Sequence, residues 1–339
     1  MASVDSRPVR TRRLGELSTS AIGFGAMVLS PGTYGPIDDD AASRALRHAI
    51  DDGAWFIDTS DSYGSGSHNE RLIGSVVGRD DGVVISTKFG LRPPAGAERH
   101  PVELAYGTLG VNCEPRLVRG YAIAALERLG RDVIDLCSPH FPDPAVPIED
   151  TVGAIADLVS EGLVRHVGLS NVTAAQLDAA AAVHSISAVQ CEWSMWAPID
   201  PDLLAVADRH GVGIVAWAPL GGGFLTGTIT QLDAGDLRNN FPRMSSENLA
   251  ANNDRFGPIR SIATELGVTP GQLALAWLLH QHPSVVPIPG SRRPEHISEN
   301  NAAATITLPD SLLARIDAAR ELFRPAGATI MDTSGATPR

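Results

Sequence analysis

WFIDTSDSYGSGSHNERLIGSVVGRDDGVVISTK, residues 55–88, has the pattern of one strand–helix–strand unit. Its two ends, 55–58 and 83–88, are short apolar runs rich in β-branched and aromatic residues, which is typical of buried strands. The segment 69–77 between them has the period of a helix. The same alternation recurs along the chain, so the sequence predicts repeated βα units on a parallel sheet.

Eight such units can be counted outward from this one. The predicted strands are Ile22–Gly25, Trp55–Asp58, Val83–Lys88, Ile134–Ser138, Val164–Ser170, Ala188–Cys191, Gly213–Ala216 and Val285–Pro287. The predicted helices are Asp38–Asp52, Asn69–Val77, Glu114–Leu129, Ile148–Glu161, Thr173–His184, Pro201–His210, Pro270–Gln281 and Arg293–Ala304. Because no linker separates the units, we expect an α/β fold, a closed (β/α)8 TIM barrel in one domain over residues 1–339, rather than two doubly wound domains.

Segments outside the eight units carry signals of their own. Residues 10–20 predict a short N-terminal hairpin, and Pro309–Phe323 predicts an accessory C-terminal helix. We expect tails at about residues 1–9 and 325–339. The stretches 90–112 and 221–253 are too long for plain connections, and loops of that length are usually functional.

The composition is that of a globular protein, because 43% of the 339 residues are hydrophobic and 19% are charged. The formal net charge of −12 would repel nucleic acid and anionic membranes, so neither partner is expected. Cys113, Cys137 and Cys191 lack the number and spacing of a disulfide framework or a metal site, so no metal is expected. The sequence has no targeting segment and no long apolar run, so we expect a cytoplasmic protein. It does not indicate the oligomeric state.

One cation is unusual. Of the 27 cationic side chains, 26 are arginine and only Lys88 is lysine. A lysine ammonium is a compact charge whose pKa burial and neighbours can change, whereas arginine keeps its proton. Lys88 is therefore a candidate for chemistry, although a coding bias toward arginine could also leave one lysine by chance.

Polar residues stand at the predicted carboxyl ends of several strands, where a barrel has its active-site mouth. Each alone has an ordinary structural explanation, such as a helix cap or a packed ring. Together they form a set that can deliver a proton to a carbonyl oxygen, which requires a hydride donor. In that set Tyr63 is the acid, and Lys88 beside it lowers its pKa. Asp58 keeps that lysine charged and oriented, and His140 binds the substrate oxygen.

At these residues the sequence resembles the aldo-keto reductases, NADPH-dependent barrel enzymes that reduce aldehydes and ketones. The similarity covers nearly the whole chain and is most specific in residues 58–64, 86–88, 134–140 and 162–171. It implies that Tyr63 is the general acid, that Lys88 and Asp58 tune it, and that His140 orients the carbonyl. The long insertions resemble the bacterial and plant branch of the family.

The resemblance also implies a site for NADPH. Ser170, Asn171 and Gln190 would hold the nicotinamide carboxamide, Trp217 would stack under the ring, and Arg292 would bind the 2′-phosphate, favouring NADPH over NADH. The full set of expected cofactor residues is Gly25, Met27, Ser170, Asn171, Gln190, Trp217, Pro219, Leu220, Gly221, Gly223, Gly290, Ser291, Arg292, His296, Glu299 and Asn300. Trp217 replaces the more frequent tyrosine, and Ala218 and Gly222 replace a usual serine and arginine.

The substrate pocket is expected to include Tyr34, Phe89 and Phe141, which suit a small hydrophobic or planar carbonyl compound. Trp55, Phe89 and Trp193 could equally belong to the core. Two other functions remain open: a cofactor-sensing accessory subunit of the same fold, and an isomerase or lyase of another barrel family. A Rossmann site is disfavoured, because Gly23-Phe24-Gly25 lacks the third glycine.

Overall fold

The computed structural model describes residues 11–79, 82–104 and 107–330. Its main sheet has eight strands, each paired in parallel with the next along the chain. They are β3 Phe24–Gly25, β4 Phe56–Asp58, β5 Val84–Phe89, β8 Ile134–Pro139, β9 Val164–Ser170, β10 Ile186–Glu192, β11 Gly213–Trp217 and β12 Val285–Pro287. All eight predicted strands are confirmed, with ends that differ by at most two residues.

The first and last strands meet and close the sheet into a barrel. The Gly23 N–H donates to the Pro287 carbonyl at 2.9 Å, and the Gly25 N–H to the Pro289 carbonyl at 3.4 Å. The two backbones touch so closely that a Cβ on Gly25 would lie 2.6 Å from the Ile288 oxygen. A Cβ on Gly290 would lie 2.3 Å from the Gly25 oxygen, so closure needs glycine on both sides. The prediction of a (β/α)8 barrel is confirmed.

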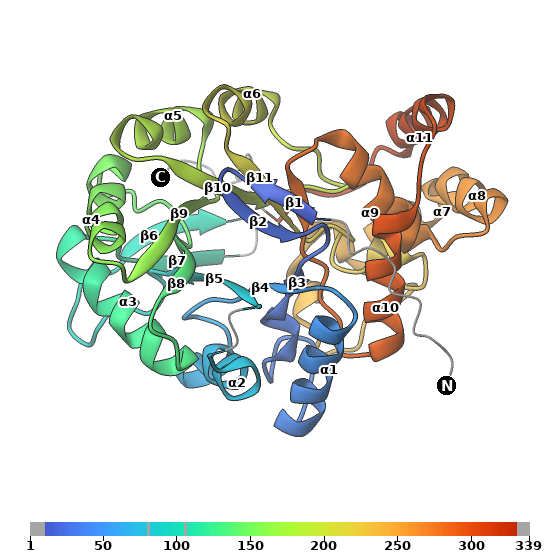
Figure 1. Cartoon of the computed structure of the whole chain (residues 1–339). Helices are drawn as coiled ribbons and strands as arrows, with labels where there is room; N and C mark the ends of the chain where they lie inside the picture. The colour runs from blue at the N-terminus through green and yellow to red at the C-terminus, as the bar shows by residue number, and fades with distance from the viewer. Residues whose placement is uncertain (1–10, 80–81, 105–106, 331–339) are drawn as a thin grey trace, which may run out of the picture.

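Eight helices surround the barrel (Figure 1): α1 Asp39–Asp51, α2 His68–Val77, α3 Pro115–Leu129, α4 Ile148–Ser160, α5 Ala174–Val183, α6 Pro201–His210, α9 Pro270–Gln281 and α10 Pro294–Ala302. Local signals set several of their ends. Thr173 and Thr269 form capping boxes at the starts of α5 and α9. Gly130 and Gly211 end α3 and α6 in the left-handed conformation. All eight predicted helices are confirmed.

The predicted N-terminal hairpin is present and plugs one end of the barrel. Its strands are β1 Thr11–Leu14 and β2 Leu17–Ser20, and Figure 1 shows them crossing the near end of the barrel. Leu14 and Leu17 are buried in one apolar cluster with Phe56, Leu136 and other residues of the barrel interior. A Cβ on Gly213 would lie 2.5 Å from the Leu14 Cα, so the hairpin backbone rests directly on β11.

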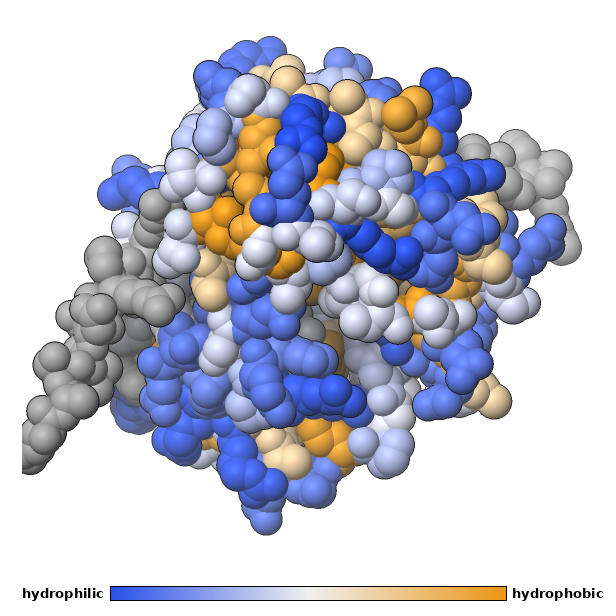
Figure 2. Space-filling model, turned by 90° about the vertical axis from the view of Figure 1, so that its right-hand side faces the viewer, coloured by the Kyte–Doolittle hydropathy of each residue, from blue (hydrophilic) through white to orange (hydrophobic). Residues whose placement is uncertain are grey.

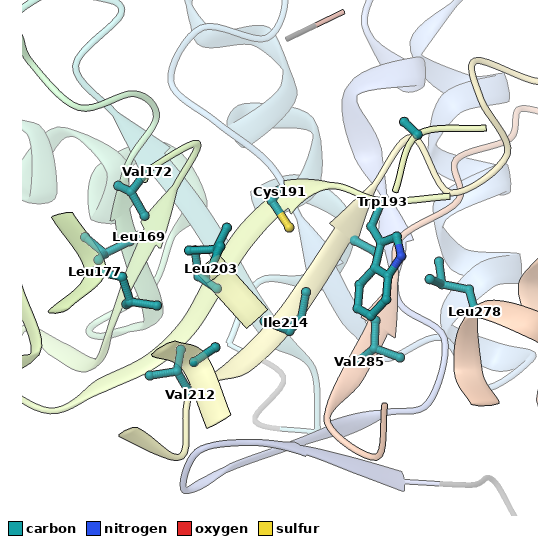
Figure 3. Close-up of a cluster of buried hydrophobic side chains, with 14 of the residues drawn as sticks. Leu169, Val172, Leu177, Cys191, Trp193, Leu203, Val212, Ile214, Leu278 and Val285 are labelled. Carbon is teal, nitrogen blue, oxygen red and sulfur yellow. The ribbon is translucent and has the colours of Figure 1, made fainter. Parts of the chain in front are cut away.

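A second, larger apolar layer lies between the outer face of the barrel and its helices. Figure 3 shows part of it, where Ile214 and Val285 of the strands face Leu203 of α6 and Leu278 of α9. Trp193 is in the same cluster and only 4% exposed, so it belongs to the core. The sequence had left open whether Trp193 lines the pocket.

The two long insertions contain elements that the sequence did not predict. Residues 90–112 include the hairpin β6 His100–Leu104 and β7 Gly107–Val111. Residues 221–253 contain short 3-10 turns and the start of α7 Ser246–Arg255, and α8 Gly257–Leu266 follows. The accessory helix α11, Asp310–Phe323, is confirmed.

The C-terminal tail begins later than expected. The Ala326 N–H donates to Asn252 Oδ1 at 2.7 Å, and the Gly327 carbonyl accepts from Arg243 Nε at 2.9 Å. These bonds attach residues 326 and 327 to α7 and the turn before it, whereas the tail was expected to start at about residue 325. Residues 1–9 and 331–339 lie outside the described part of the chain.

The surface over the C-terminal helices is mixed. Figure 2 faces the side that carries α7 to α11 and is mostly hydrophilic, with apolar areas mainly in its upper part. Leu322 of α11 is 77% exposed. Among the described residues, no helix combines the length and apolarity that crossing a bilayer requires.

Candidate active site

The centre of the site is a buried ion pair between two neighbouring strands. Lys88 in β5 donates through Nζ to both carboxylate oxygens of Asp58 in β4, at 2.8 and 2.7 Å, and to the Thr59 carbonyl at 2.8 Å. Both side chains are nearly inaccessible to solvent. Burial lowers the pKa of the Lys88 ammonium and the Asp58 carboxylate opposes that shift. The three acceptors fix the ammonium at one point.

Tyr63 and His140 lie next to this charge. Lys88 Nζ is 5.3 Å from the centre of the Tyr63 ring. The Tyr63 and His140 rings meet edge to face, with centroids 5.7 Å apart. The structure therefore brings together all four residues of the predicted catalytic set, Asp58, Tyr63, Lys88 and His140, which come from the ends of β4, β5 and β8 and from the segment after β4.

His140 is held in its neutral form. Burial, and then the Lys88 charge, lower its pKa well below the ordinary value. Its Nδ1 is 2.9 Å from Ser60 Oγ, and its ring stacks on Phe141 with centroids 5.2 Å apart. A neutral imidazole donates from only one nitrogen, and which nitrogen that is depends on whether the Ser60 hydroxyl donates to Nδ1 or accepts from it.

A second acidic layer lies behind the ion pair. Asp61 accepts from the Gly90 N–H at 3.2 Å, and its Oδ1 lies 3.3 Å from Ser60 Oγ. Burial and the Glu70 charge raise the pKa of Asp61 to about 7. Glu70 accepts from Thr87 Oγ1 at 2.6 Å and pairs with Arg128. These contacts join the segment that carries Tyr63 to the end of β5, which carries Lys88.

The residues expected around the nicotinamide form a connected row at the mouth. Gln190 donates to Asp58 Oδ1 at 2.8 Å, so its amide group supports the ion pair. Asn171 donates to the His140 carbonyl at 3.0 Å and to Ser170 Oγ at 3.1 Å. Asn171 Oδ1 accepts from Trp217 Nε1 at 3.1 Å. The indole of Trp217 thus has a fixed orientation, and Asn171 adopts φ +58°, which asparagine tolerates best among larger residues.

The segment after β11 has an unusual backbone. Ala218, Gly221 and Gly223 have φ of +47°, +57° and +93°. A non-glycine residue at positive φ is strained and is often found at functional sites. Pro219 and Leu220 lie within this tight turn, which follows Trp217 directly. Gly25 ends β3 and Met27 lies in the turn after it, and Gly25 touches the segment of Gly290 across the barrel closure.

Arg292 has a different set of partners from the one expected. All five of its guanidinium N–H groups point to backbone carbonyls of the segment 28–36. A phosphate could bind Arg292 only by displacing some of these bonds. Arg293 and His296 are both exposed at the start of α10, and Ser291 Oγ accepts from the Arg293 N–H at 3.2 Å.

Two further expected cofactor residues lie on α10. Glu299 accepts from Thr269 Oγ1 at 2.6 Å and thereby links α10 to the start of α9. Asn300 is buried, with 8% of its surface exposed. The structure thus gives Glu299 a contact that stabilises the packing of two helices.

The three expected pocket residues occupy different environments. Phe89 stacks on Tyr121 of α3, with centroids 5.3 Å apart, and is buried in the outer core. The last residue of β5 thus points outward from the barrel, away from the pocket position expected for Phe89. Phe141 is buried under the β6–β7 hairpin, and its ring stacks on His140. Tyr34 is half-buried, and the Arg238 guanidinium lies 4.9 Å from its ring centre.

Sequence reasoning missed several residues that shape the site. Ser86 donates to Asp58 Oδ1 at 3.1 Å, Ser60 contacts His140, and Asp61 holds Gly90. All three lie in or beside the quoted motif, so their spacing from Asp58 and Lys88 was a usable signal. Arg238 has no such signal, because its contact with Tyr34 joins two distant loops.

Comparisons with known proteins show which family this chain resembles. The family model described as "Aldo/keto reductase family" matches residues 21–321. The aldo-keto reductase yakc [NADP(+)] of Schizosaccharomyces pombe is 38% identical over 330 residues, covering 94% of each chain. The aldo-keto reductase str7 of Strobilurus tenacellus is 37% identical over 324 residues, covering 91% of each.

Solved structures of similar fold include a glycerol dehydrogenase and an aldo-keto reductase. The glycerol dehydrogenase AKR11B4 of Gluconobacter oxydans superposes with a TM-score of 0.79 at 26% identity, covering 96% of this chain and 100% of that one. An aldo-keto reductase of Klebsiella pneumoniae in complex with NADPH superposes with a TM-score of 0.70 at 26% identity, covering 96% of this chain and 99% of that one. From the family model and the identity of its relatives over nearly its whole length, this chain belongs to the aldo-keto reductase family.

Proposed function

We propose that this protein is an NADPH-dependent reductase that converts a small aldehyde or ketone to the alcohol, with Tyr63 as the general acid. The observation that supports this most is the buried Lys88 ammonium, held by both oxygens of Asp58 and 5.3 Å from the Tyr63 ring centre. A phenol has an ordinary pKa of about 10, and a fixed positive charge beside it favours the phenolate. Tyr63 can thus give its proton to a carbonyl oxygen as charge develops there.

His140 would orient that oxygen. If the Ser60 hydroxyl donates to Nδ1 across their 2.9 Å contact, Nε2 carries the ring proton and donates to the substrate. The low pKa keeps the imidazole neutral, so it does not compete with Tyr63 as an acid. Preorganised donors of this kind stabilise charge on the reacting oxygen.

The residues at the mouth fit a nicotinamide dinucleotide. The Trp217 indole is half-buried and fixed by Asn171, so it offers a planar face of stable orientation to an aromatic ring. Ser170 and Asn171 supply hydrogen-bonding groups beside it, and Arg293 supplies an exposed cation at the start of α10, where a phosphate also gains helix N–H donors. When bound, this cofactor would supply the hydride that reduces the carbonyl carbon. The NADP(+) in the name of the Schizosaccharomyces pombe relative and the NADPH in the Klebsiella pneumoniae structure support the same cofactor.

The proposed substrate is a small carbonyl compound. Trp217, Tyr34 and the Phe141 ring stacked on His140 make the surroundings of the polar centre largely aromatic, which suits an apolar or planar substituent. We also propose a cytoplasmic location. Its support is that all three cysteines are buried free thiols, as expected in a reducing compartment.

The test is a turnover assay with NADPH and a panel of aliphatic and aromatic aldehydes, followed at the absorbance of the reduced nicotinamide. We expect consumption of NADPH that depends on the aldehyde and is lost in Tyr63→Phe. A protein that binds NADPH, by fluorescence titration, and reduces no member of the panel would contradict the proposal. That outcome would favour the alternative of a cofactor-sensing accessory subunit.

A further inference from the structure

The side chain of Arg292 binds the backbone carbonyls of one whole loop, residues 28–36. Arg292 follows β12 and donates through Nε to the Val28 carbonyl at 2.6 Å. Its Nη1 donates to the carbonyls of Tyr34 and Pro36 at 3.0 and 3.2 Å, and its Nη2 to those of Ser30 and Gly35 at 3.5 and 3.3 Å. Guanidinium has five N–H groups, so every donor of Arg292 has an acceptor within the segment 28–36.

The segment 28–36 lies next to the expected cofactor site. It connects the end of β3 to α1 and starts just after Gly25 and Met27, which are in the expected cofactor set. It carries Tyr34 at its far end. Each of the five bonds joins residues more than 250 positions apart, so Arg292 attaches the first βα loop of the barrel to the last one.

A second cation contacts a side chain of the same loop. The guanidinium of Arg238 lies 4.9 Å from the Tyr34 ring centre, which is within the range of a cation–π contact. Arg238 also donates to the Gly222 carbonyl at 2.8 Å and pairs with Asp236 at 2.6 Å. The segment 28–36 is therefore in contact both with the segment after β12 and with the insertion after β11.

We propose that Arg292 is a positioning residue that fixes the segment 28–36, and with it Tyr34, at the mouth of the barrel, and that it does not read the 2′-phosphate. The planar fork of arginine suits this task, because it can direct five donors to several carbonyls at once, whereas lysine has three donors at one point. Selection of NADPH over NADH then falls to the exposed Arg293. The inference rests on the proposed function only for its kinetic arm.

The experiment compares Arg292→Ala and Arg292→Lys with the matched neighbour Arg293→Ala. Fluorescence titrations give the Kd for NADPH and for NADH, turnover assays give kcat and KM for the aldehyde, and hydrogen exchange reports the backbone of 28–36. For Arg292→Ala we expect equal weakening of both cofactors, by about threefold to tenfold, and a KM that rises more than kcat falls. Amides in 28–36 should exchange about tenfold faster or more.

The two other variants sharpen the result. Arg292→Lys should fall between wild type and Arg292→Ala in exchange, which also covers the case in which the alanine variant does not fold. Arg293→Ala should weaken NADPH by about tenfold, leave NADH unchanged and leave the exchange of 28–36 as in wild type.

The opposite pattern would overturn the inference. If Arg292→Ala loses NADPH selectively while NADH affinity and exchange in 28–36 stay at wild-type values, Arg292 reads the phosphate. Unchanged exchange with no change in either cofactor also contradicts it. Because hydrogen exchange needs neither substrate nor turnover, this result stands even if the wild-type protein reduces no aldehyde.

Discussion

The interior of the barrel is filled by apolar side chains at one end and by polar side chains at the other. At the end where β1 and β2 lie, Leu14 and Leu17 fill the interior and join an apolar cluster of barrel residues. At the other end, Asp58, Lys88 and Gln190 are nearly as deeply buried, yet they are polar and hydrogen-bonded to one another. The same closed sheet excludes water at both ends.

The apolar end contributes mainly to the stability of the fold, and the polar end mainly to its chemistry. Burial of leucine stabilises the fold directly, whereas burial of an ion pair costs desolvation that its partners only offset. The polar end is therefore not where the fold gains most of its stability. Removal of the Tyr63 hydroxyl at the mouth should change turnover with little effect on unfolding, and truncation of Leu14 at the other end should do the reverse.

The largest effect is expected for Tyr63→Phe. The substitution removes the proton donor and leaves the ring, so kcat should fall by about 10² to 10⁴-fold with Kd for NADPH unchanged. Steady-state kinetics and a fluorescence titration measure the two quantities. Undiminished turnover would contradict the role of Tyr63, and a large loss of thermal stability would blur the separation of the two ends.

Lys88→Arg tests the fixed point charge at the same end. Lys88 is buried, and a planar guanidinium is bulkier and spreads its charge, so it should neither fit against Asp58 and Thr59 nor act on Tyr63 from the same place. We expect kcat to fall by at least about tenfold. Near-wild-type kcat in a folded variant would mean that any cation suffices.

Leu14→Ala tests the apolar end of the barrel, which the β1–β2 hairpin closes. Leu14 is fully buried, and removing its side chain leaves a cavity that costs about 2–5 kcal/mol of unfolding free energy. The exposed Leu322→Ala is the matched control, with an expected change within about 0.5 kcal/mol. Denaturant titrations give both values. If kcat per folded Leu14→Ala molecule also dropped tenfold, the two ends would not be separable.

The smallest effect concerns Asp61. Folding raises the pKa of Asp61 from 3.8 to about 7, so the folded state holds this proton more tightly than the unfolded chain does. Its contribution to stability is complete below about pH 4 and is lost as the pH rises through 7. Asp61→Asn should therefore lose less unfolding free energy than wild type between pH 4 and 8, measured by denaturant titrations.

The exposed Asp233→Asn is the control for that series, and it should follow the wild-type pH dependence. An Asp61→Asn profile parallel to wild type would mean that Asp61 stays ionised in the folded protein.

Much of this protein was predictable from local patterns. Each strand and barrel helix has its own periodicity, and caps such as Thr173 and Gly130 act within four residues. The catalytic set could be identified for the same reason. Asp58 and Tyr63 belong to one segment and Lys88 ends the next strand, so a parallel sheet must bring them to the same edge.

Other features depend on contacts that no local pattern encodes. Phe89 follows Lys88 in β5, so the alternation of a strand already turns it outward, but only the packing of α3 decides that its ring stacks on Tyr121. The β6–β7 hairpin packs on Phe141, and its residue His100 forms a hydrogen bond with Asp143. Phe141 and Asp143 both lie outside the hairpin.

The sequence by itself determined the eight βα units and the residues of the polar centre, because strand and helix formation and the position of a residue at a strand end are properties of short segments. Only the tertiary structure decided the partners of Arg292. Its sequence context, at the start of a helix and beside another arginine, suggests a phosphate. Closure of the barrel brings β3 against β12 and places five carbonyls within its reach, and contacts across some 260 residues depend on that closure alone.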